Sequence, residues 1–244
     1  MTISALIPAR LNSTRLDKKL LIDLGGVPVI VRTYQNIIAT GLFDEVIVVT
    51  DSDEIISVLN QYNIKFFKSI KTHQTGTDRI AEFSEELKTD IIINIQGDEP
   101  FINREDLVKI IEEFKIDTTN EINLISLMIK LKNPRDISNP NNVKVVVDNS
   151  SDAILFSRSS IPFSRSDFKP NFYKHIGVYA FRNTFLKEFA KYHQTPLEKA
   201  EMIEALRVVE NGKKIRMIEV FKEHVSIDTL EDLKIAESIL NEKW

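Results

Sequence analysis

The sequence predicts an α/β protein, and two observations carry this prediction. Short runs rich in Ile and Val recur in the first half of the chain, and polar residues follow each run, as expected for strands that are buried on both faces and end at a sheet edge. These runs are residues 3–7, 45–50 and 90–95. Amphipathic stretches alternate with them, at residues 28–40, 53–62 and 78–87. The alternation indicates three units in which crossover helices join parallel strands.

The second half of the chain has a different texture after Asn133. Prolines interrupt short strand-like runs at residues 143–147, 153–156 and 175–181. This pattern predicts a β-rich insertion at roughly 134–182. Beyond it, helices are expected at 183–192, 198–211 and 230–243 and a strand at 215–220. We expect one domain over residues 1–244 that contains the insertion.

The composition excludes several classes of protein. With 244 residues and 43% hydrophobic content, the chain can build one substantial core. No apolar run reaches the roughly 18 residues that span a bilayer, and no basic leader precedes the first expected strand, so we expect a cytoplasmic protein with no membrane partner. The absence of cysteine excludes disulfides, thiol nucleophiles and Cys-ligated zinc. A net charge of −4 does not attract nucleic acid, so an anionic ligand needs a local basic cluster.

Such a cluster follows the first expected strand. Arg10, Arg15, Lys18 and Lys19 place four cations within ten residues, at the strand end where ligands bind in open α/β sheets. A triphosphate carries about four negative charges, and displacement at its α-phosphate needs Arg or Lys donors together with a metal. The segment is not a Walker loop, because the glycines and the Lys-Ser or Lys-Thr ending are absent. The alternative interpretation is an exposed loop that contributes only to solubility.

Two aspartates are candidate magnesium ligands. Asp98 lies in the turn 96–100, directly after the most hydrophobic expected strand. Magnesium at such a turn needs only a few carboxylates, completed by phosphate oxygens and water. Asp228 is the candidate for the second carboxylate. Each has a structural alternative: Asp98 could belong to an ordinary turn or cap the next helix, and Asp228 or Thr229 could cap the final helix.

The polar loop at residues 73–79 leads into an expected helix. Exposed backbone N–H groups and hydroxyls at a helix start could read a pyrimidine edge or a phosphate. Helix capping by Thr75 or Thr77 explains the same residues equally well.

Two further patterns carry weak signals. His175 and Tyr179 share one side of an expected strand, where His175 could donate to a sugar carboxylate or be a structural residue. Asp51-Ser52-Asp53 spells the Asp-x-Asp metal motif of glycosyltransferases. Asp53 equally suits the first turn of the next helix.

The ordered set of short motifs is more specific than any one of them. It comprises Ile7-Pro8-Ala9-Arg10 with Ser13-Thr14-Arg15-Leu16 and Lys19, Gly76-Thr77-Asp78-Arg79, Asn94-Ile95-Gln96-Gly97-Asp98-Glu99-Pro100, Phe156-Ser157-Arg158 with Ile161-Pro162, Lys174-His175-Ile176-Gly177-Val178-Tyr179, Pro196-Leu197-Glu198 and Ile227-Asp228-Thr229. In this order, and over essentially the whole chain, the motifs resemble those of the 3-deoxy-manno-octulosonate (Kdo) cytidylyltransferases, also called CMP-Kdo synthetases. The related sialic acid enzymes typically carry Gly-Ser-Lys where this chain has Ser13-Thr14-Arg15, which favours the Kdo branch.

The resemblance implies a Rossmann-like nucleotide-diphospho-sugar transferase fold with a mixed, mainly parallel sheet, and a homodimer built through the β-rich insertion. It implies a magnesium-dependent enzyme that joins CMP from CTP to the anomeric hydroxyl of a 3-deoxy-ulosonic acid and releases pyrophosphate. Kdo is the expected acid, and the product would serve lipopolysaccharide synthesis. No protein nucleophile is needed, because the metal and the cations orient the reactants and stabilise charge.

The resemblance also implies roles for residues of this chain. The catalytic set would be Arg10, Lys19, Asp98 and Asp228, of which Asp98 and Asp228 would bind magnesium. The nucleotide would contact Ala9, Arg10, Arg15, Lys19, Thr75, Gly76, Arg79 and Gln96. The sugar would contact Arg158, His175, Tyr179 and Glu204.

Two departures from the family pattern affect the expected choice of sugar and the flexibility of the basic loop after the first strand. Ala205 stands where the family usually has Gln, and loss of one hydrogen-bonding group at a recognition site changes selectivity by orders of magnitude. Asp17-Lys18 replaces the usual Pro-Gly after Leu16, which makes the loop less constrained and adds a cation. Kdo, 8-amino-Kdo and another ulosonate therefore stay open as substrates. A catalytically silent nucleotide-binding homologue also stays open.

Overall fold

The structure is a computed structural model that describes residues 1–13, 15–222 and 224–242. Its backbone forms two compact units, Met1–Leu107 with His224–Trp244, and Val108–Glu223. The second unit contains the β-rich insertion predicted at 134–182 and is wider than it. A single domain over the whole chain stays a prediction. In the described part of the chain, no helix is both long and apolar enough to cross a membrane.

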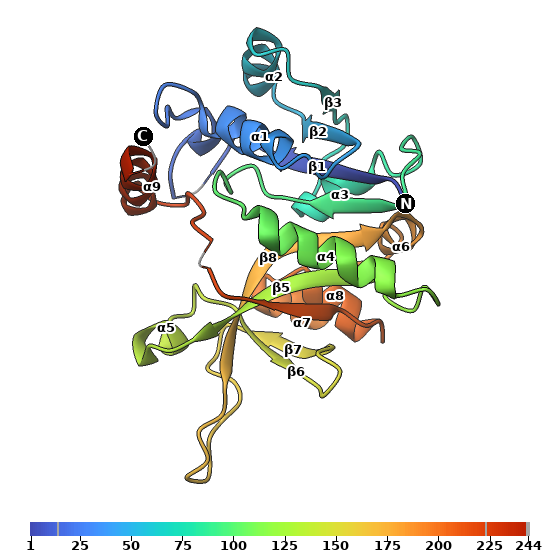
Figure 1. Ribbon diagram of the computed structural model, residues 1–244, viewed down its shortest axis with the longest axis vertical. Helices are drawn as coiled ribbons and strands as arrows, with labels where there is room; N and C mark the ends of the chain where they lie inside the picture. Colours follow the sequence, from blue (N-terminus) through green and yellow to red (C-terminus); the bar gives the residue numbers. More distant parts are fainter. Residues whose placement is uncertain (14, 223, 243–244) are drawn as a thin grey trace. The chain divides into compact units, whose positions relative to one another are not determined.

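The first unit contains a parallel sheet (Figure 1). Its strands are β1 (Ile3–Ala9), β2 (Glu45–Thr50), β3 (Phe66–Lys68) and β4 (Ile91–Asn94). They are hydrogen-bonded in the order β3-β2-β1-β4, and every pair is parallel. All residues of β1 and β4 are buried, as their continuous apolar runs predict for strands covered on both faces. The three predicted strands are confirmed, whereas β3 was missed because three residues show no periodicity.

Helices of the first unit connect these strands or follow them. They are the 3-10 helix η1 (Lys19–Leu21), α1 (Val29–Ala39), α2 (Asp53–Gln61), α3 (Gly76–Ala81) and α9 (Leu230–Glu242), while α4 (Arg104–Ile116) runs from the first unit into the second. The extent predicted for the helix at 78–87 is wrong, since α3 ends at Ala81. The Ser84 hydroxyl donates to the Ala81 carbonyl over 2.8 Å, and such a bond competes with helix continuation. Lys243, predicted as the end of the last helix, lies outside the described residues.

The second unit contains both parallel and antiparallel strand pairs. Its strands are β5 (Leu124–Leu131), β6 (Lys144–Val147), β7 (Ala153–Ser157), β8 (Phe172–Arg182) and β9 (Arg216–Val220). β5 pairs antiparallel with β8 and parallel with β9, while β6 pairs antiparallel with β7 and β8. The pairing of β5 with β8 shifts register after Ser126, which leaves Gly177 and Val178 of β8 without partners on β5. The strands predicted in the insertion are confirmed, and β5 was not predicted.

The helices of the second unit are short. They are α5 (Pro134–Ser138), α6 (Asn183–Phe189), α7 (Pro196–Glu201) and α8 (Ala205–Glu210). The single helix predicted at 198–211 is wrong, because Met202 adopts a left-handed conformation with φ of 55° and ends α7. A buried pair joins the two pieces, since Arg207 of α8 donates to both carboxylate oxygens of Glu198 over 2.9 and 2.6 Å. This bidentate contact fixes the turn that carries Glu204.

Candidate active site

Three side chains from distant parts of the chain meet in the first unit. Asp98 lies in the loop after β4, Asp228 lies just before α9, and Lys19 begins η1. The Lys19 ammonium donates to Asp98 Oδ2 and to Asp228 Oδ1, the latter over 2.8 Å. Arg15 adds a second cation, with its guanidinium 2.8 Å from Asp228 Oδ2. The fold therefore brings together three of the four predicted catalytic residues.

Close packing fixes the loop that carries Asp98. A Cβ at Gly97 would lie 3.1 Å from the Ile30 side chain and 3.2 Å from the Leu20 side chain, so a larger residue would push α1 or η1 aside. The Thr33 hydroxyl of α1 donates to the Gly97 carbonyl over 2.9 Å. The position of the Asp98 carboxylate is thus set by the packing of its neighbours.

Capping of α9 does not use the Asp228 carboxylate. The Thr229 hydroxyl accepts from the Asp232 amide over 3.2 Å, and the Asp232 carboxylate accepts from the Thr229 amide over 2.8 Å, which is the reciprocal arrangement of a capping box. The Ile227 amide donates to the Asp98 carbonyl over 2.9 Å and ties the two aspartate segments together. Of the two residues predicted to be able to cap α9, Thr229 is the cap, and Asp228 is left to face Lys19.

The electrostatics of this cluster suit a cation. Only 13% of the Lys19 side chain is exposed, against 17% for Asp98 and 30% for Asp228. Burial alone would lower the pKa of Lys19, but the charges and hydrogen bonds of the two aspartates outweigh burial and raise this pKa above its ordinary value. Lys19 is therefore charged at neutral pH. Its ammonium lies where a cation shared by both carboxylates would lie.

These residues fit a magnesium ion that a nucleotide completes. In the described part of the chain, no group of three or more His, Asp or Glu side chains could hold a metal by itself. Mg²⁺ usually keeps several waters and takes one or two carboxylates plus phosphate oxygens. Asp98 and Asp228 would supply those two carboxylates, and the Lys19 ammonium is a stand-in for the ion between them.

Arg10, the fourth predicted catalytic residue, is exposed directly after β1. Unlike Arg15 and Lys19, it forms no ion pair within the described residues. Its guanidinium is thus open to an anionic ligand. Ala9 is only 1% exposed, so its predicted nucleotide contact would come from the backbone. Thr14 of the same motif lies outside the described residues.

Gly76 and Gln96, both predicted for the cytidine pocket, are neighbours. A Cβ at Gly76 would lie 3.1 Å from Gln96 Oε1 and 3.1 Å from the Pro8 ring, so only glycine leaves this side of the amide uncovered. A relay holds that amide: Gln96 Nε2 donates to Asn94 Oδ1 over 3.3 Å, and Asn94 Nδ2 donates to Thr77 Oγ1 over 3.0 Å. This network assigns Nε2 of Gln96 to Asn94 and leaves Oε1 as an acceptor without a hydrogen bond among the described residues.

Thr75 and Arg79 have partners within the first unit. The Thr75 hydroxyl accepts from the Asp78 amide over 3.1 Å and caps α3, as the alternative interpretation predicted. Arg79 is 7% exposed, and its guanidinium lies 2.9 and 3.1 Å from the two carboxylate oxygens of Asp51. A contact of Thr75 or Arg79 with a base stays a prediction.

The Asp51-Ser52-Asp53 motif is used in packing contacts of the first unit. Asp51 binds Arg79, and Asp53 accepts from Lys68 over 2.7 Å. Ser52 caps α2, and Asp53 is in the first turn of that helix. These contacts support the helix-start interpretation of the motif over a metal site.

His175, predicted for the sugar site, is buried on β8. Its ring centroid lies 4.9 Å from that of Phe156 and 5.3 Å from that of Tyr179. Its Nε2 lies 2.9 Å from the Ser126 hydroxyl, which donates to the Val178 carbonyl over 2.8 Å, so Nε2 carries the proton and donates to Ser126. Burial lowers the pKa of His175 to about 3. The imidazole is neutral near pH 7, which fits a structural residue better than a charged donor.

Tyr179 and Glu204 lie within electrostatic reach of each other in the second unit. Burial, and then the charges of Glu204 and Glu198, raise the pKa of Tyr179 well above its ordinary value. The hydroxyl of Tyr179 therefore keeps its proton. With His175 beside Tyr179, the fold brings together three of the four residues predicted for the sugar.

Arg158, the fourth, is held by backbone carbonyls. Its guanidinium donates to the carbonyls of Glu201 and Pro140 over 2.8 and 2.9 Å. The backbone carbonyl of Arg158 accepts in turn from the ammonium of the fully buried Lys144 over 2.5 Å. Burial, and then the nearby charge of Arg158, lower the pKa of Lys144. A contact of Arg158 with a sugar stays a prediction.

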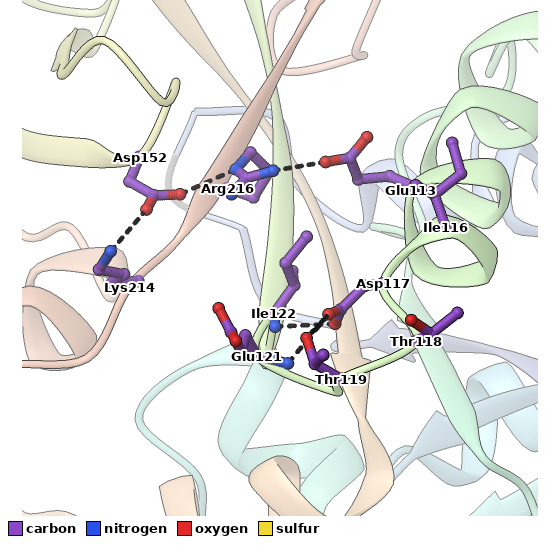
Figure 2. Close-up of a pocket in the computed structure, with 10 residues that line it drawn as sticks. All are labelled: Glu113, Ile116, Asp117, Thr118, Thr119, Glu121, Ile122, Asp152, Lys214 and Arg216. Carbon is purple, nitrogen blue, oxygen red and sulfur yellow. Dashed lines mark hydrogen bonds and ion pairs between the residues drawn. The ribbon is translucent and has the colours of Figure 1, made fainter.

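A pocket of about 300 Å³ opens elsewhere in the second unit. It is lined by Glu113, Ile116, Asp117, Thr118, Thr119, Glu121, Ile122, Asp152, Lys214 and Arg216. Figure 2 shows the Arg216 guanidinium between the carboxylates of Asp152 and Glu113, with Lys214 on the other side of Asp152. None of the predicted site residues lines this pocket, and its two cations, Lys214 and Arg216, pair with its own carboxylates, so we do not assign the active site to it.

Comparison with known proteins decides the family. The family model described as cytidylyltransferase matches residues 4–215. A 3-deoxy-manno-octulosonate cytidylyltransferase of Flavobacterium johnsoniae is 47% identical over 243 residues, which cover 99% of this chain and 100% of that protein. The chain belongs to the 3-deoxy-manno-octulosonate cytidylyltransferase family.

Two further matches agree with this family. A protein of the same name from Christiangramia forsetii is 45% identical over 98% of this chain and 97% of its own length. A solved structure of CMP:2-keto-3-deoxy-manno-octonic acid synthetase complexed with CTP has a TM-score of 0.93 and 31% identity, and the match covers 100% of both chains. The predicted α/β nucleotidyltransferase fold with a mixed sheet is thereby confirmed.

Several residues that position the site of this cytidylyltransferase family member were not predicted. Thr33 holds the Gly97 loop, Asn94 orients Gln96, and Lys144 supports the Arg158 backbone. Their one sequence signal is a polar residue within an apolar run, as in Ile91-Ile92-Ile93-Asn94. Buried polar groups need partners, so such residues are candidates for positioning roles.

Thr229→Ala should lower the free energy of unfolding by about 1 kcal/mol, because the hydroxyl that caps α9 is lost. Asp228→Asn should change it by less than about 0.5 kcal/mol, since the carboxylate is partly exposed and Lys19 keeps Asp98 as a partner. Urea unfolding of both variants measures the two effects. A larger loss for Asp228→Asn than for Thr229→Ala would mean that Asp228 is the residue that stabilises the helix start.

His175→Gln should make stability less sensitive to acid. The folded-state pKa of His175 is about 3 against an ordinary value of 6.5, so between these pH values the unfolded state binds a proton that the folded state does not. Stability from this residue is complete above pH 6.5 and falls, as pH decreases toward 3, by about 1.4 kcal/mol per pH unit. Unfolding curves at pH 7, 6 and 5 should therefore diverge between wild type and variant, and parallel curves would contradict the buried neutral imidazole.

Proposed function

We propose that this protein transfers CMP from CTP to the anomeric hydroxyl of Kdo, releases pyrophosphate and forms CMP-Kdo for lipopolysaccharide synthesis. One observation carries the proposal. Lys19, Asp98 and Asp228 meet in the first unit, in a chain that is 47% identical to a 3-deoxy-manno-octulosonate cytidylyltransferase over almost its whole length.

The chemistry is an in-line displacement at the α-phosphorus of CTP. The anomeric oxygen of the sugar forms the new P–O bond and loses its proton, and the bond from the α-phosphorus to the bridging oxygen of pyrophosphate breaks. The exposed Arg10 and Arg15 would bind the phosphates and orient the leaving group. Lys19 would stabilise the charge that builds up on the phosphate oxygens.

We infer that the divalent metal of this reaction is magnesium and that Asp98 and Asp228 hold it. Two carboxylates without a third metal-binding side chain, in the part of the chain that the structure describes, suit an ion completed by phosphate oxygens and water. The bound ion would supply charge neutralisation at the phosphate oxygens.

Selection of cytosine is assigned to Gln96. Because Nε2 of Gln96 donates to Asn94, its Oε1 is the acceptor that is left to contact a base. The amino group of cytosine is a donor where uracil has an acceptor. An acceptor fixed at Gln96 therefore favours CTP over UTP.

The sugar side is assigned to the second unit. Tyr179 keeps its proton and can donate to a hydroxyl or carboxylate, and Glu204 can accept from a hydroxyl. Ala205 is 1% exposed and offers no side-chain amide. The choice between Kdo and 8-amino-Kdo thus depends on the groups around it, and the assay below includes both. CTP is a cytoplasmic metabolite, so the proposal goes with a cytoplasmic location.

We also propose a homodimer formed through the β-rich insertion. Residues 158–171 form a long excursion between β7 and β8 (Figure 1). Phe163 and Phe168 in this excursion are 87% and 74% exposed. Exposed apolar residues of this size gathered in one segment are typical of a protein interface.

Light scattering after size exclusion should therefore give the mass of a dimer. The double variant Phe163→Ser with Phe168→Ser should shift the protein toward monomer, because it removes the exposed aromatic rings. Phe221→Ser is the matched control, since Phe221 is 80% exposed but lies outside the excursion and contacts Lys109. A monomeric wild type, or equal effects of both changes, would contradict the proposed interface.

The reaction is tested by pyrophosphate release from CTP and magnesium with Kdo, 8-amino-Kdo or N-acetylneuraminate as acceptor. We expect release with an eight-carbon ulosonate and not with N-acetylneuraminate, and at least a tenfold lower kcat/KM with UTP. No release with any acceptor, despite CTP binding, would indicate a silent homologue.

Asp98→Asn and Asp228→Asn should each abolish turnover and leave the fold intact, with the larger loss of metal affinity for Asp228→Asn. Full activity in either variant would contradict its metal role.

A further inference from the structure

The two adjacent lysines of the opening loop have different partners. Lys18 has a left-handed backbone with φ of 47°, and its ammonium lies 2.6 Å from the Glu54 carboxylate on the surface. Lys19 follows it into η1 and places its ammonium between Asp98 and Asp228. The buried Leu20 anchors this turn. The local backbone therefore sends two neighbouring cations to two different sites.

The carboxylates that would bind a metal are already engaged by cations. Lys19 takes Asp98 Oδ2 and Asp228 Oδ1, and Arg15 takes Asp228 Oδ2. Both oxygens of Asp228 and one of Asp98 are thus engaged by these two cations. A metal ion that binds both aspartates must displace the Lys19 ammonium, because two cations cannot share the same carboxylate oxygens at contact distance without strong repulsion.

A polyphosphate can take over the displaced ammonium. A nucleoside triphosphate carries about four negative charges, and Lys is a flexible point charge on four carbons that can turn from one anion to another. Arg10 is exposed and forms no ion pair among the described residues, so it offers the phosphates a first contact.

We propose that Lys19 is an internal counter-ion that keeps the metal position closed until a nucleoside triphosphate draws its ammonium away. This inference rests on the proposed function, since it takes CTP as the ligand of the loop. It makes binding ordered: the metal alone binds weakly, and the nucleotide strengthens metal binding. Because coupling between two sites is reciprocal, the metal strengthens nucleotide binding by the same factor.

The test is metal binding to the protein without nucleotide. Mn²⁺ is the probe, because it accepts the same oxygen ligands and free Mn²⁺ is measured directly by electron paramagnetic resonance. Lys19→Met should bind Mn²⁺ at least tenfold more tightly than wild type, since the competing ammonium is gone. Lys18→Met is the matched control, and it should bind Mn²⁺ as wild type does, because its ammonium pairs with Glu54.

Two further variants locate the effect and guard against misfolding. Lys19→Gln keeps a hydrogen-bond donor without the charge and should show the same direction of change if Lys19→Met is unstable. Adding Asp98→Asn to Lys19→Met should abolish the gain in Mn²⁺ affinity. A gain that persists in this double variant would place the ion elsewhere and overturn the proposal.

Equal or weaker Mn²⁺ binding by folded Lys19→Met and Lys19→Gln, compared with wild type, would also overturn it. Pyrophosphate release by wild type tests the proposed function separately. An active wild type whose Lys19 variants gain no Mn²⁺ affinity would refute the counter-ion role alone. A wild type that releases no pyrophosphate, with a tenfold gain in the Lys19 variants, would refute the proposed function alone.

Discussion

The carboxylates of Asp98 and Asp228 come to one place from distant parts of the chain, and like charges at such a place require a cation. In this structure the cation is the Lys19 ammonium. The neighbouring contacts serve this arrangement: Gly97 permits close packing, Thr33 holds the loop, and Ile227 joins the two aspartate segments. The capping of α9 by Thr229 and Asp232 leaves the Asp228 carboxylate free to face Lys19, while the Asp228 amide donates to Asp232. The site that we propose for magnesium and triphosphate rests on this constraint.

The two units contribute different chemistry. The predicted nucleotide and metal residues of the first unit include charged groups that are partly exposed, as ligands of an anionic substrate must be. The predicted sugar residues of the second unit are more enclosed: His175 is neutral, and Tyr179 keeps its proton. The protonated hydroxyl of Tyr179 suits the discrimination of hydroxyl groups, because a mismatched substrate would leave this buried donor unpaired. Ala205, which stands where the family usually has Gln, is equally buried.

Much of the fold could be predicted, because strands buried on both faces read as apolar runs; β1, β2 and β4 follow this rule. The short β3, the early end of α3 at Ala81 and the break at Met202 could not, since each depends on one local contact or backbone conformation. The meeting of Asp98 and Asp228 could not be predicted from local patterns, which gave only two separate metal-ligand candidates. Which of Asp228 and Thr229 caps α9 depends on where Asp232 points, and the sequence pattern does not contain that information.

For the predicted sugar residues, the sequence pattern predicted which side chains lie together but not their non-local partners. The even spacing of His175 and Tyr179 predicted a shared face, and their rings do lie together. The neutral state of His175 follows from its burial, and its Nε2 lies 2.9 Å from the hydroxyl of Ser126 on the neighbouring strand β5. A local pattern cannot reveal such a non-local partner.

The most direct test of this account is a crystal structure with CTP and Mn²⁺, in which anomalous scattering locates the metal. The account predicts one anomalous peak bound by Asp98, Asp228 and a phosphate oxygen, with the Lys19 ammonium moved from the aspartates to the triphosphate. A metal bound away from Asp98 and Asp228, or a Lys19 ammonium that still bridges both aspartates while CTP is bound, would contradict it.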